Sequence, residues 1–303
     1  MSLSRPSLSR TEQRNPLSTG LDRMPTTELL ALINAEDRTV PLAVAAVLPS
    51  LAVAVDMAVA ALSAGHRVHY VGAGTSGRIA VLDAAELIPT FGVSPDLVVA
   101  HIAGGVPALT RPSEGAEDDE AAGASVAAFE AGDLVVGVTA SGRTPYVRGA
   151  LTAARASGAG TVLISADPAS PLAALADVHV APDTGPEVLT GSTRMKAGTA
   201  QKLILNAFST ATMVRLGRTY SNLMTDMLAA NAKLRDRRLR ILAEATGADE
   251  PACVQALADA DGDTKLAVVI LISGAPADRA RQALSDARGH AHTALTSLNG
   301  HHT

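Results

Sequence analysis

Residues 67–92, RVHYVGAGTSGRIAVLDAAELIPTFG, decide the fold of this 303-residue chain. The segment opens with the alternating β-branched and aromatic residues of a strand, passes through a glycine-rich turn at 72–78 and continues as a helix. Glycine lets the backbone turn tightly where a Cβ would clash. A strand, a glycine-rich turn and a helix in this order predict one βα unit of a parallel sheet.

The turn itself, GAGTSGR, offers backbone N–H groups, two hydroxyls and a helix N-terminus, which together favour an anion such as phosphate. Its spacing is not the full dinucleotide fingerprint, and it lacks the Lys-Ser/Thr ending of a nucleotide P-loop. Taken alone, it is more simply interpreted as an ordinary βα turn. Further along the chain a similar turn occurs, and this makes Thr75, Ser76, Gly77 and Arg78 candidate phosphate-binding residues.

The alternation of strand and helix continues along the chain. Apolar, β-branched runs predict further strands at 96–103, 133–139, 160–165 and 177–181. Helical patterns occur at 26–35, 40–64, 112–130 and 145–156. The sequence therefore predicts an α/β fold in which about five parallel strands, joined in βαβ units, are flanked by helices.

Both ends of the chain differ from this pattern. Residues 1–20 are rich in Ser, Pro and Arg and are expected to form a loose arm. Residues 195–240 are mostly helical, and 241–303 carry apolar stripes typical of a helical appendage. We therefore predict an N-terminal arm (1–25), a main domain (26–240) and a small helical C-terminal domain (241–303).

The composition argues against several classes of protein. A hydrophobic fraction of 47% with only 2% aromatic residues predicts a core of Ala, Val, Leu and Ile. A net charge of −5 and the scarcity of aromatic residues argue against nucleic-acid binding, and the basic run at 233–242 is interpreted as a solvated helix face. The single cysteine, Cys253, excludes an intramolecular disulfide and is expected to be a small core residue.

No membrane segment, signal sequence or metal site is predicted. Apolar runs such as 40–62 are interrupted by Pro49 and Asp56. The N-terminus carries arginines but no apolar signal core. The histidines do not repeat with the spacing of a ligand set. We therefore expect a cytoplasmic protein with neither membrane nor nucleic acid as a partner.

A second hydroxyl-rich turn, TASGRTPY at 139–146, follows the predicted strand 133–139. Its candidate phosphate-binding residues are Ser141, Gly142 and Thr144. Ligands of open parallel sheets lie at the carboxyl ends of strands near the switch point, where the two turns could share one phosphate. A nucleotide would also need a Mg²⁺-binding carboxylate and a phosphate-binding lysine, so a sugar phosphate fits better.

Two carboxylates are placed for acid–base chemistry. Glu86 follows Arg78 by two helical turns on the same face, and its apolar segment AAELIP would raise its pKa; an exposed helix-end glutamate is the equal alternative. Glu117 lies in SEGAEDDE, where Ser113 can cap a helix, and acidic residues are favourable at a helix start without any catalytic role. Arg78 and Arg143 could complement the substrate anion or pair with acidic residues.

Four segments of the chain resemble the N-acetylmuramic acid 6-phosphate etherases of the sugar isomerase (SIS) superfamily. They are GAGTSGRIAVLDAAELIPTFG, EGAEDD, ASGRTPYV and, most specifically, TGSTRMKAGTAQKLILNAFST within 187–210. The resemblance extends from TEQRNP at 11–16 to the helical tail. It implies a flavodoxin-like SIS fold and cleavage of the D-lactyl ether of N-acetylmuramic acid 6-phosphate, giving N-acetylglucosamine 6-phosphate and D-lactate.

The resemblance also implies roles for individual residues. The two functional glutamates of the family correspond to Glu86, the proton donor to the departing lactate, and to Glu117, a candidate base or water-activating group. The amino-sugar phosphate would lie against Thr75, Ser76, Ser141 and Thr144. The resemblance further implies a homodimer whose sites are completed across the interface, with no metal or redox cofactor. It leaves the roles of Glu187 and Lys196 open.

Two other functions stay open at this point. An aldose–ketose isomerase would use the same fold and the same removal of a C2 proton, but it would release no lactate. The block at 187–210 and EGAEDD argue against it. A non-catalytic sugar-phosphate sensor would bind the same ligand and regulate a partner protein. The presence of both Glu86 and Glu117 favours an enzyme over a sensor.

Overall fold

The computed structural model describes residues 9–228 and 232–300, and these fall into two compact units. The first unit comprises Met1–Ala84 and Asp96–Ser209, and the second comprises Ala85–Pro95 and Thr210–Thr303. The domain boundaries predicted from the sequence, at 25/26 and 240/241, stay a prediction.

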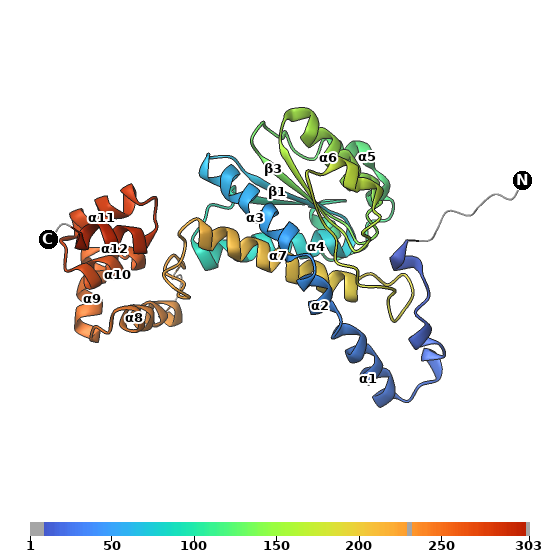
Figure 1. Ribbon diagram of the computed structural model, residues 1–303, viewed down its shortest axis with the longest axis horizontal. Helices are drawn as coiled ribbons and strands as arrows, with labels where there is room; N and C mark the ends of the chain where they lie inside the picture. The colour runs from blue at the N-terminus through green and yellow to red at the C-terminus, as the bar shows by residue number, and fades with distance from the viewer. Residues whose placement is uncertain (1–8, 229–231, 301–303) are drawn as a thin grey trace, which may run out of the picture. The chain divides into compact units, whose positions relative to one another are not determined.

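The first unit is built on one parallel sheet (Figure 1). Its strands lie in the order β2-β1-β3-β4-β5, and every neighbouring pair is parallel. The strands are β1 (Val68–Gly72), β2 (Val98–Ile102), β3 (Leu134–Val138), β4 (Gly160–Ile164) and β5 (Val178–Val180). All five predicted strands are therefore confirmed, and the strand order is that of a flavodoxin-like fold.

Helices cover both faces of this sheet, which is why β1 and β3 are buried along their whole length. Successive side chains of a strand point to opposite faces. Val71 packs in a cluster with residues of α6 (Pro145–Ser157), whereas the ring of Tyr70 lies 6.1 Å from that of Phe208 on α7 (Lys196–Arg215). Continuous apolar strands are the sequence signature of such two-sided burial.

The helices confirm the predictions at 26–35 and 145–156, which correspond to α1 (Thr26–Asp37) and α6. The single helix predicted at 40–64 is wrong, because the chain breaks into α2 (Val40–Ala45) and α3 (Leu48–Ser63). Pro49 explains the break: it has no N–H to continue a helix and instead occupies the first turn of α3.

The long helix predicted at 112–130 is also wrong. Only the short 3₁₀ helix η5 (Ala116–Asp118) and α5 (Glu120–Ala124) form there, after Gly115 with a positive φ of 72°. The residue that caps α5 is Asp119, whose side chain accepts from the Ala122 N–H at 2.8 Å, and not Ser113. The other short 3₁₀ helices of this unit beyond α3 are η4 (Val106–Leu109) and η6 (Pro171–Leu175).

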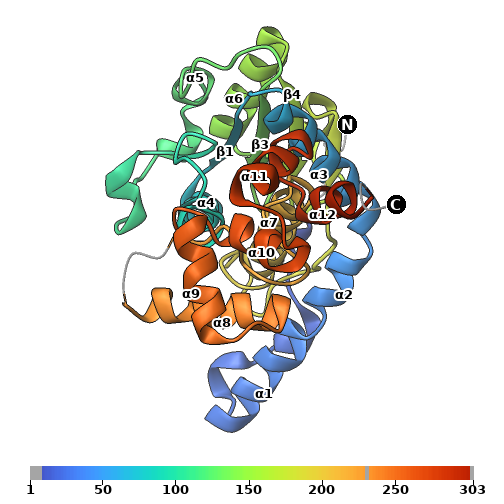
Figure 2. The ribbon, with the colours of Figure 1, turned by 90° about the vertical axis from the view of Figure 1, so that its left-hand side faces the viewer.

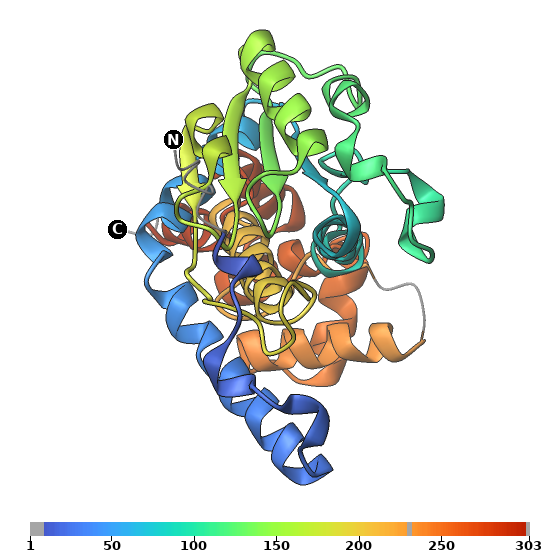
Figure 3. The same cartoon turned by 90° about the vertical axis from the view of Figure 1, so that its right-hand side faces the viewer.

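The N-terminal segment is more ordered than the sequence predicted. Three short helices, η1 (Arg10–Glu12), η2 (Pro16–Ser18) and η3 (Leu21–Arg23), occupy its described part, whereas 1–8 lie outside the described residues. Asn15 is buried and donates to the Glu36 carboxylate at 2.7 Å. In Figure 3 this dark-blue segment runs beside the yellow chain that precedes α7. The expected loose arm is therefore wrong for the described part.

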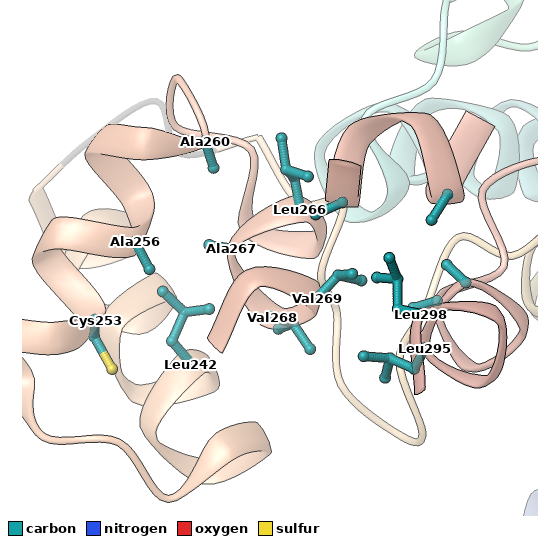
Figure 4. Packing of buried hydrophobic residues seen from close by; sticks show 14 residues of the cluster. Leu242, Cys253, Ala256, Ala260, Leu266, Ala267, Val268, Val269, Leu295 and Leu298 are labelled. Atoms are coloured by element: carbon teal, nitrogen blue, oxygen red, sulfur yellow. The ribbon is translucent and has the colours of Figure 1, made fainter. Parts of the chain in front are cut away.

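The second unit contains a helical domain, seen face-on in Figure 2. Its helices are α8 (Ala232–Thr246), α9 (Glu250–Asp259), α10 (Thr264–Ser273), α11 (Ala277–Asp286) and α12 (Ala291–Asn299). The apolar α10 packs against each of the other four, and Figure 4 shows Leu266, Ala267, Val268 and Val269 of α10 inside the shared core. Cys253 is buried in the same core, as predicted.

The helices within residues 9–228 and 232–300 can be compared with the dimensions of a membrane. No single helix among them has the length and apolar composition of a membrane span, and only Thr26–Ala45 and Leu48–Ser63 taken together, as a pair bent by 60°, reach that length and composition.

A pair of histidines lies inside the first unit, on the neighbouring strands β1 and β2. Nδ1 of His69 on β1 lies 3.0 Å from Nε2 of His101 on β2, and Nε2 of His69 lies 3.4 Å from the Asp133 carboxylate. Burial lowers the pKa of both rings, that of His101 to about 4, and the neighbouring His69 adds to the shift of His101. Two neutral imidazoles therefore share this contact at neutral pH.

Acid should destabilise the fold through this pair. The pKa of His101 is about 4 when folded and 6.5 when unfolded, so between these values the unfolded chain binds more protons. The stabilisation is therefore complete above pH 6.5 and is lost as the pH falls toward 4. Urea unfolding measured between pH 8 and 4 should show a smaller loss in His101→Gln than in the wild type. Equal pH dependence in the two proteins would contradict this account.

The turn after β1 should tolerate no side chain at Gly77. A Cβ on Gly77 would lie 2.6 Å from Ile102 Cγ1 and 2.7 Å from the Gly72 carbonyl oxygen, so Gly77→Ala should cost about 2 kcal/mol or more of unfolding free energy. Gly198→Ala on α7 is the matched control, because the nearest atoms lie at 3.4 Å and alanine favours a helix. Urea denaturation midpoints compare the two; an equal stability of both variants would refute the packing argument.

Candidate active site

The strand order creates a switch point between β1 and β3. The chain adds β2 on one side of β1 and then crosses back to add β3, β4 and β5 on the other. The helices that follow β1 and β3 therefore lie on opposite faces of the sheet, and the switch point lies between the two turns at the carboxyl ends of these strands. Because Gly72 and Val138 are paired at the ends of β1 and β3, the two hydroxyl-rich turns leave the sheet side by side.

The first turn is closed by two glycines. α4 (Gly74–Phe91) begins two residues after β1 ends, and a Cβ on Gly72 would lie 2.9 Å from the Gly77 backbone nitrogen. Gly74 has a positive φ of 53°, which glycine adopts without strain. This tight passage places Thr75 at the surface of the turn and buries Ser76 beneath it.

A pocket of about 430 Å³ opens beside this turn. Thr75 and Arg78 of α4 line it together with Glu114 and Glu117 of the 112–117 segment. Its volume suits a small phosphorylated ligand. The structure thus brings together three of the residues that the sequence singled out, namely Thr75, Arg78 and Glu117.

Arg78, which lines this pocket, donates hydrogen bonds to two backbone carbonyls. Its Nε donates to the Leu109 oxygen at 3.1 Å and its Nη2 to the Arg111 oxygen at 3.2 Å. The planar guanidinium makes both bonds from fixed directions, which a lysine cannot do. Arg78 therefore fixes the segment that leads to Glu117. The sequence could not reveal this role, because carbonyl acceptors thirty residues away leave no trace in composition or spacing.

The second turn is held by its own side chains. Thr139 Oγ1 lies 2.8 Å from Thr144 Oγ1, the Arg143 N–H donates to Ser141 Oγ at 3.2 Å, and Gly142 has a positive φ of 67°. Ser170, the N-cap of η6, donates from its Oγ to the Gly142 carbonyl at 2.7 Å and so fixes the turn. Ser141, Gly142 and Thr144 are not among the residues that line the pocket of Glu117. The two turns are neighbours at the ends of the paired strands β1 and β3.

Glu86 does not lie in the apolar surroundings that its sequence suggested. It is exposed on α4, as is the adjacent Ala85, and it is not among the residues that line the Glu117 pocket. The helix turns its apolar face, which includes Ala84 and Leu87, away from Glu86. Of the two equal alternatives that the sequence left open, the single chain therefore shows the exposed glutamate.

The carboxylate that is buried on α4 is Asp83. It accepts hydrogen bonds from the Tyr70 hydroxyl and from Ser209 Oγ, both at 3.1 Å. Burial raises the pKa of Asp83 to about 6, against the opposing effect of these two donors. The only sequence signal for this group was an aspartate placed on the apolar stripe of the helix.

The 187–210 block is anchored by two buried charges. Glu187 is 0% exposed and accepts from the Lys196 and Ala197 N–H groups, both at 2.9 Å, so it caps α7. Burial raises the pKa of Glu187, and the two N–H donors act against that shift. The Lys196 ammonium binds the Glu36 carboxylate at 2.6 Å. Both residues, which the sequence left open, hold the backbone in place here.

The described part of the chain contains no group of three His, Cys, Asp or Glu side chains arranged to hold a metal ion. The polar side chains that line the pocket carry two hydroxyls, a guanidinium and two carboxylates, a set suited to binding a phosphate and moving protons.

The fold and this site define a SIS-domain protein. The model of the SIS domain matches residues 109–211, and that of the glucokinase regulatory protein N-terminal SIS domain matches residues 50–155. A phosphoheptose isomerase structure from Francisella tularensis aligns with a TM-score of 0.49 at 18% identity, covering 62% of this chain and 98% of that one.

Curated relatives give the particular family. An N-acetylmuramic acid 6-phosphate etherase of Thermobifida fusca is 61% identical over 87% of this chain and 87% of its own length. Another, from Pectobacterium atrosepticum, is 52% identical over 94% of this chain and 95% of its own length. The chain belongs to the N-acetylmuramic acid 6-phosphate etherase family, as its sequence motifs predicted.

Arg78→Lys should separate geometry from charge at this pocket. Lysine keeps the positive charge but cannot reach both carbonyls, so the wall that carries Glu117 should loosen and kcat/KM for the phosphorylated substrate should fall roughly ten- to a hundredfold. Arg111→Ala is the matched control, because Arg78 uses only the backbone oxygen of Arg111. Steady-state kinetics of both variants test this. Wild-type kinetics in Arg78→Lys would rule out the positioning role.

Proposed function

We propose that this protein cleaves the D-lactyl ether of N-acetylmuramic acid 6-phosphate, giving N-acetylglucosamine 6-phosphate and D-lactate in the recycling of cell-wall sugar. The observation that carries the proposal at the level of the site is the pocket at the end of β1, which Glu117 lines together with Thr75 and Arg78. Relatives of 50–61% identity that bear the etherase name support the same reaction.

The chemistry needs only proton transfers and the addition of water. Opening of the sugar ring exposes an aldehyde at C1, which makes the C2 proton acidic. A carboxylate removes that proton, a carboxylic acid protonates the lactate oxygen as the C3–O bond breaks, and water then adds to C3 of the unsaturated aldehyde. Each step is general acid–base catalysis, so the reaction as written requires no metal or redox cofactor.

In this proposal Glu117 removes the C2 proton or activates the water, and Glu86 protonates the departing lactate. The position of Glu117 in the pocket beside a hydroxyl and a guanidinium supports the first assignment. The second assignment rests on the DAAE segment that the chain shares with the family pattern. Asp83, one helical turn before Glu86, is engaged with Tyr70 and Ser209 and leaves Glu86 as the free carboxylate of this segment.

The phosphate of the substrate is proposed to bind at the two hydroxyl-rich turns. Backbone N–H groups at the start of a helix favour a phosphate, and both turns lead directly into one, α4 and α6. The proposed ligands in these turns are Thr75, Ser76, Gly77, Arg78, Ser141, Gly142 and Thr144. The side-by-side exit of the turns from β1 and β3 supports their acting on one ligand.

We further propose a cytoplasmic homodimer. Leu82, one turn before Glu86 on the same face of α4, keeps 53% of its surface exposed. A second copy of the chain covering this face would bury Leu82 and enclose Glu86.

Lactate release from N-acetylmuramic acid 6-phosphate, measured with EDTA present, tests the function directly. The wild type should release lactate, whereas Glu117→Gln and Glu86→Gln should each lose about a hundred- to ten-thousandfold in turnover and still bind the sugar phosphate. Glu120→Gln is the matched control, because Glu120 pairs with Arg148 outside the pocket.

Each outcome has a separate meaning. Binding without lactate release in the wild type would favour the sugar-phosphate sensor, to which the match with the glucokinase regulatory protein domain also points. Conversion of an aldose phosphate to a ketose phosphate without lactate would favour the isomerase. Full activity in Glu86→Gln or Glu117→Gln would remove that residue from the mechanism.

A further inference from the structure

The second unit contains a pocket that the proposed reaction does not use. It has a volume of about 420 Å³, and all its lining residues belong to this unit. Three cationic side chains from three different segments line it: Arg218 follows α7, Arg238 lies on α8 and Lys265 lies on α10. We propose that this pocket is a binding site for a small oxyanion of the phosphate class.

Two of the three cations share a single carboxylate. Lys265 is only 8% exposed. Its Nζ donates to the Gly217 carbonyl at 2.7 Å and to Asp226 Oδ2 at 2.9 Å. The same Asp226 oxygen lies 3.5 Å from Arg218 Nη1. One negative charge therefore faces two positive charges, and this arrangement leaves one positive charge uncompensated at the pocket wall.

The third cation, Arg238, has a donor that the described residues leave unused. Its Nε is buried and has no hydrogen-bond partner among them. A buried donor without an acceptor is unfavourable, and a guanidinium matches the two oxygens of a phosphate in bidentate geometry. Gly262, with a positive φ of 81°, brings the turn before α10 close to this group: a Cβ there would lie 3.8 Å from Arg238 Nη1.

The second carboxylate of the pocket does not neutralise Arg238. Asp263 is the N-cap of α10, and its side chain accepts from the Leu266 N–H at 2.9 Å. The lining thus carries three cations and two carboxylates, each carboxylate already accepting a hydrogen bond from the protein. Thr264 and Ser285 add hydroxyl groups to the same wall. A bound oxyanion would supply the acceptors that this excess of donors lacks.

Titration with inorganic phosphate by isothermal calorimetry tests the proposal on the full chain. Ionic strength is held constant with sodium chloride, so that a general salt effect does not register as binding. The wild type is compared with Arg238→Gln and with the matched control Arg240→Gln, whose side chain is exposed on the same helix and does not line the pocket. Both variants keep the turns after β1 and β3, so the difference between them reports only this pocket.

Arg238→Gln should weaken the binding of phosphate at this site roughly ten- to a hundredfold, because a charge-assisted hydrogen bond is lost, whereas Arg240→Gln should bind like the wild type. Arg218→Gln, at a more exposed position, provides a second variant should Arg238→Gln fail to fold, and it should weaken binding in the same direction. Equal affinity and stoichiometry in the wild type and in whichever of these variants fold would overturn the proposal.

The same proteins assayed for lactate release keep this proposal separate from the proposed function. Without added phosphate, all three variants should release lactate at the wild-type rate, because none of the substituted residues belongs to the proposed catalytic or substrate-binding set. Loss of phosphate binding with normal lactate release in Arg238→Gln is the expected result. Normal phosphate binding in that variant refutes the oxyanion site and leaves the etherase proposal unaffected.

Discussion

The candidate active site depends on the close approach of two backbones, that of the last residue of β1 and that of the first turn of α4. Gly72 and Gly77 lie so near each other that a Cβ on either would fall within 3 Å of the other's backbone. No other pair of residue types permits this approach. It brings the start of α4 directly over the end of β1, and Thr75 and Arg78 reach one side of the pocket for that reason.

The segment that carries Glu117 is fixed by hydrogen bonds from a charged side chain that is distant in the sequence. The Arg78 guanidinium does not meet a carboxylate but binds two carbonyl groups of the segment that continues to Glu117. In the same unit, Lys196 and Glu36 form a buried pair to which Asn15 also donates, so the N-terminal segment, α1 and the start of α7 are joined at one point. Buried charges of this kind fix geometry because each loses much of its hydration and needs every partner.

The same principle distinguishes the carboxylates of α4. Asp83 and Glu86 are separated by one turn of one helix, yet the first is buried among hydroxyl donors and the second is exposed. A group that is fully engaged with the protein cannot also exchange protons freely with a substrate, whereas an exposed carboxylate can. The division between a structural and a chemically available acid therefore follows from which face of α4 meets the sheet and α7.

The sequence by itself determined the five strands, the two glycine-rich turns, the family and the absence of a disulfide, because these depend on local composition: continuous apolar runs, glycines at a strand end and a single cysteine. Only the tertiary structure decided that Arg78 serves the 109–111 backbone, that Asp83 and not Glu86 is buried, and that residues 9–24 are anchored through Asn15. The hydrogen bonds behind these findings join residues that are 13 to 126 positions apart in the sequence. A pattern in the sequence records which residues are apolar or flexible, but the partner of a polar group is chosen by the packing that brings distant segments together.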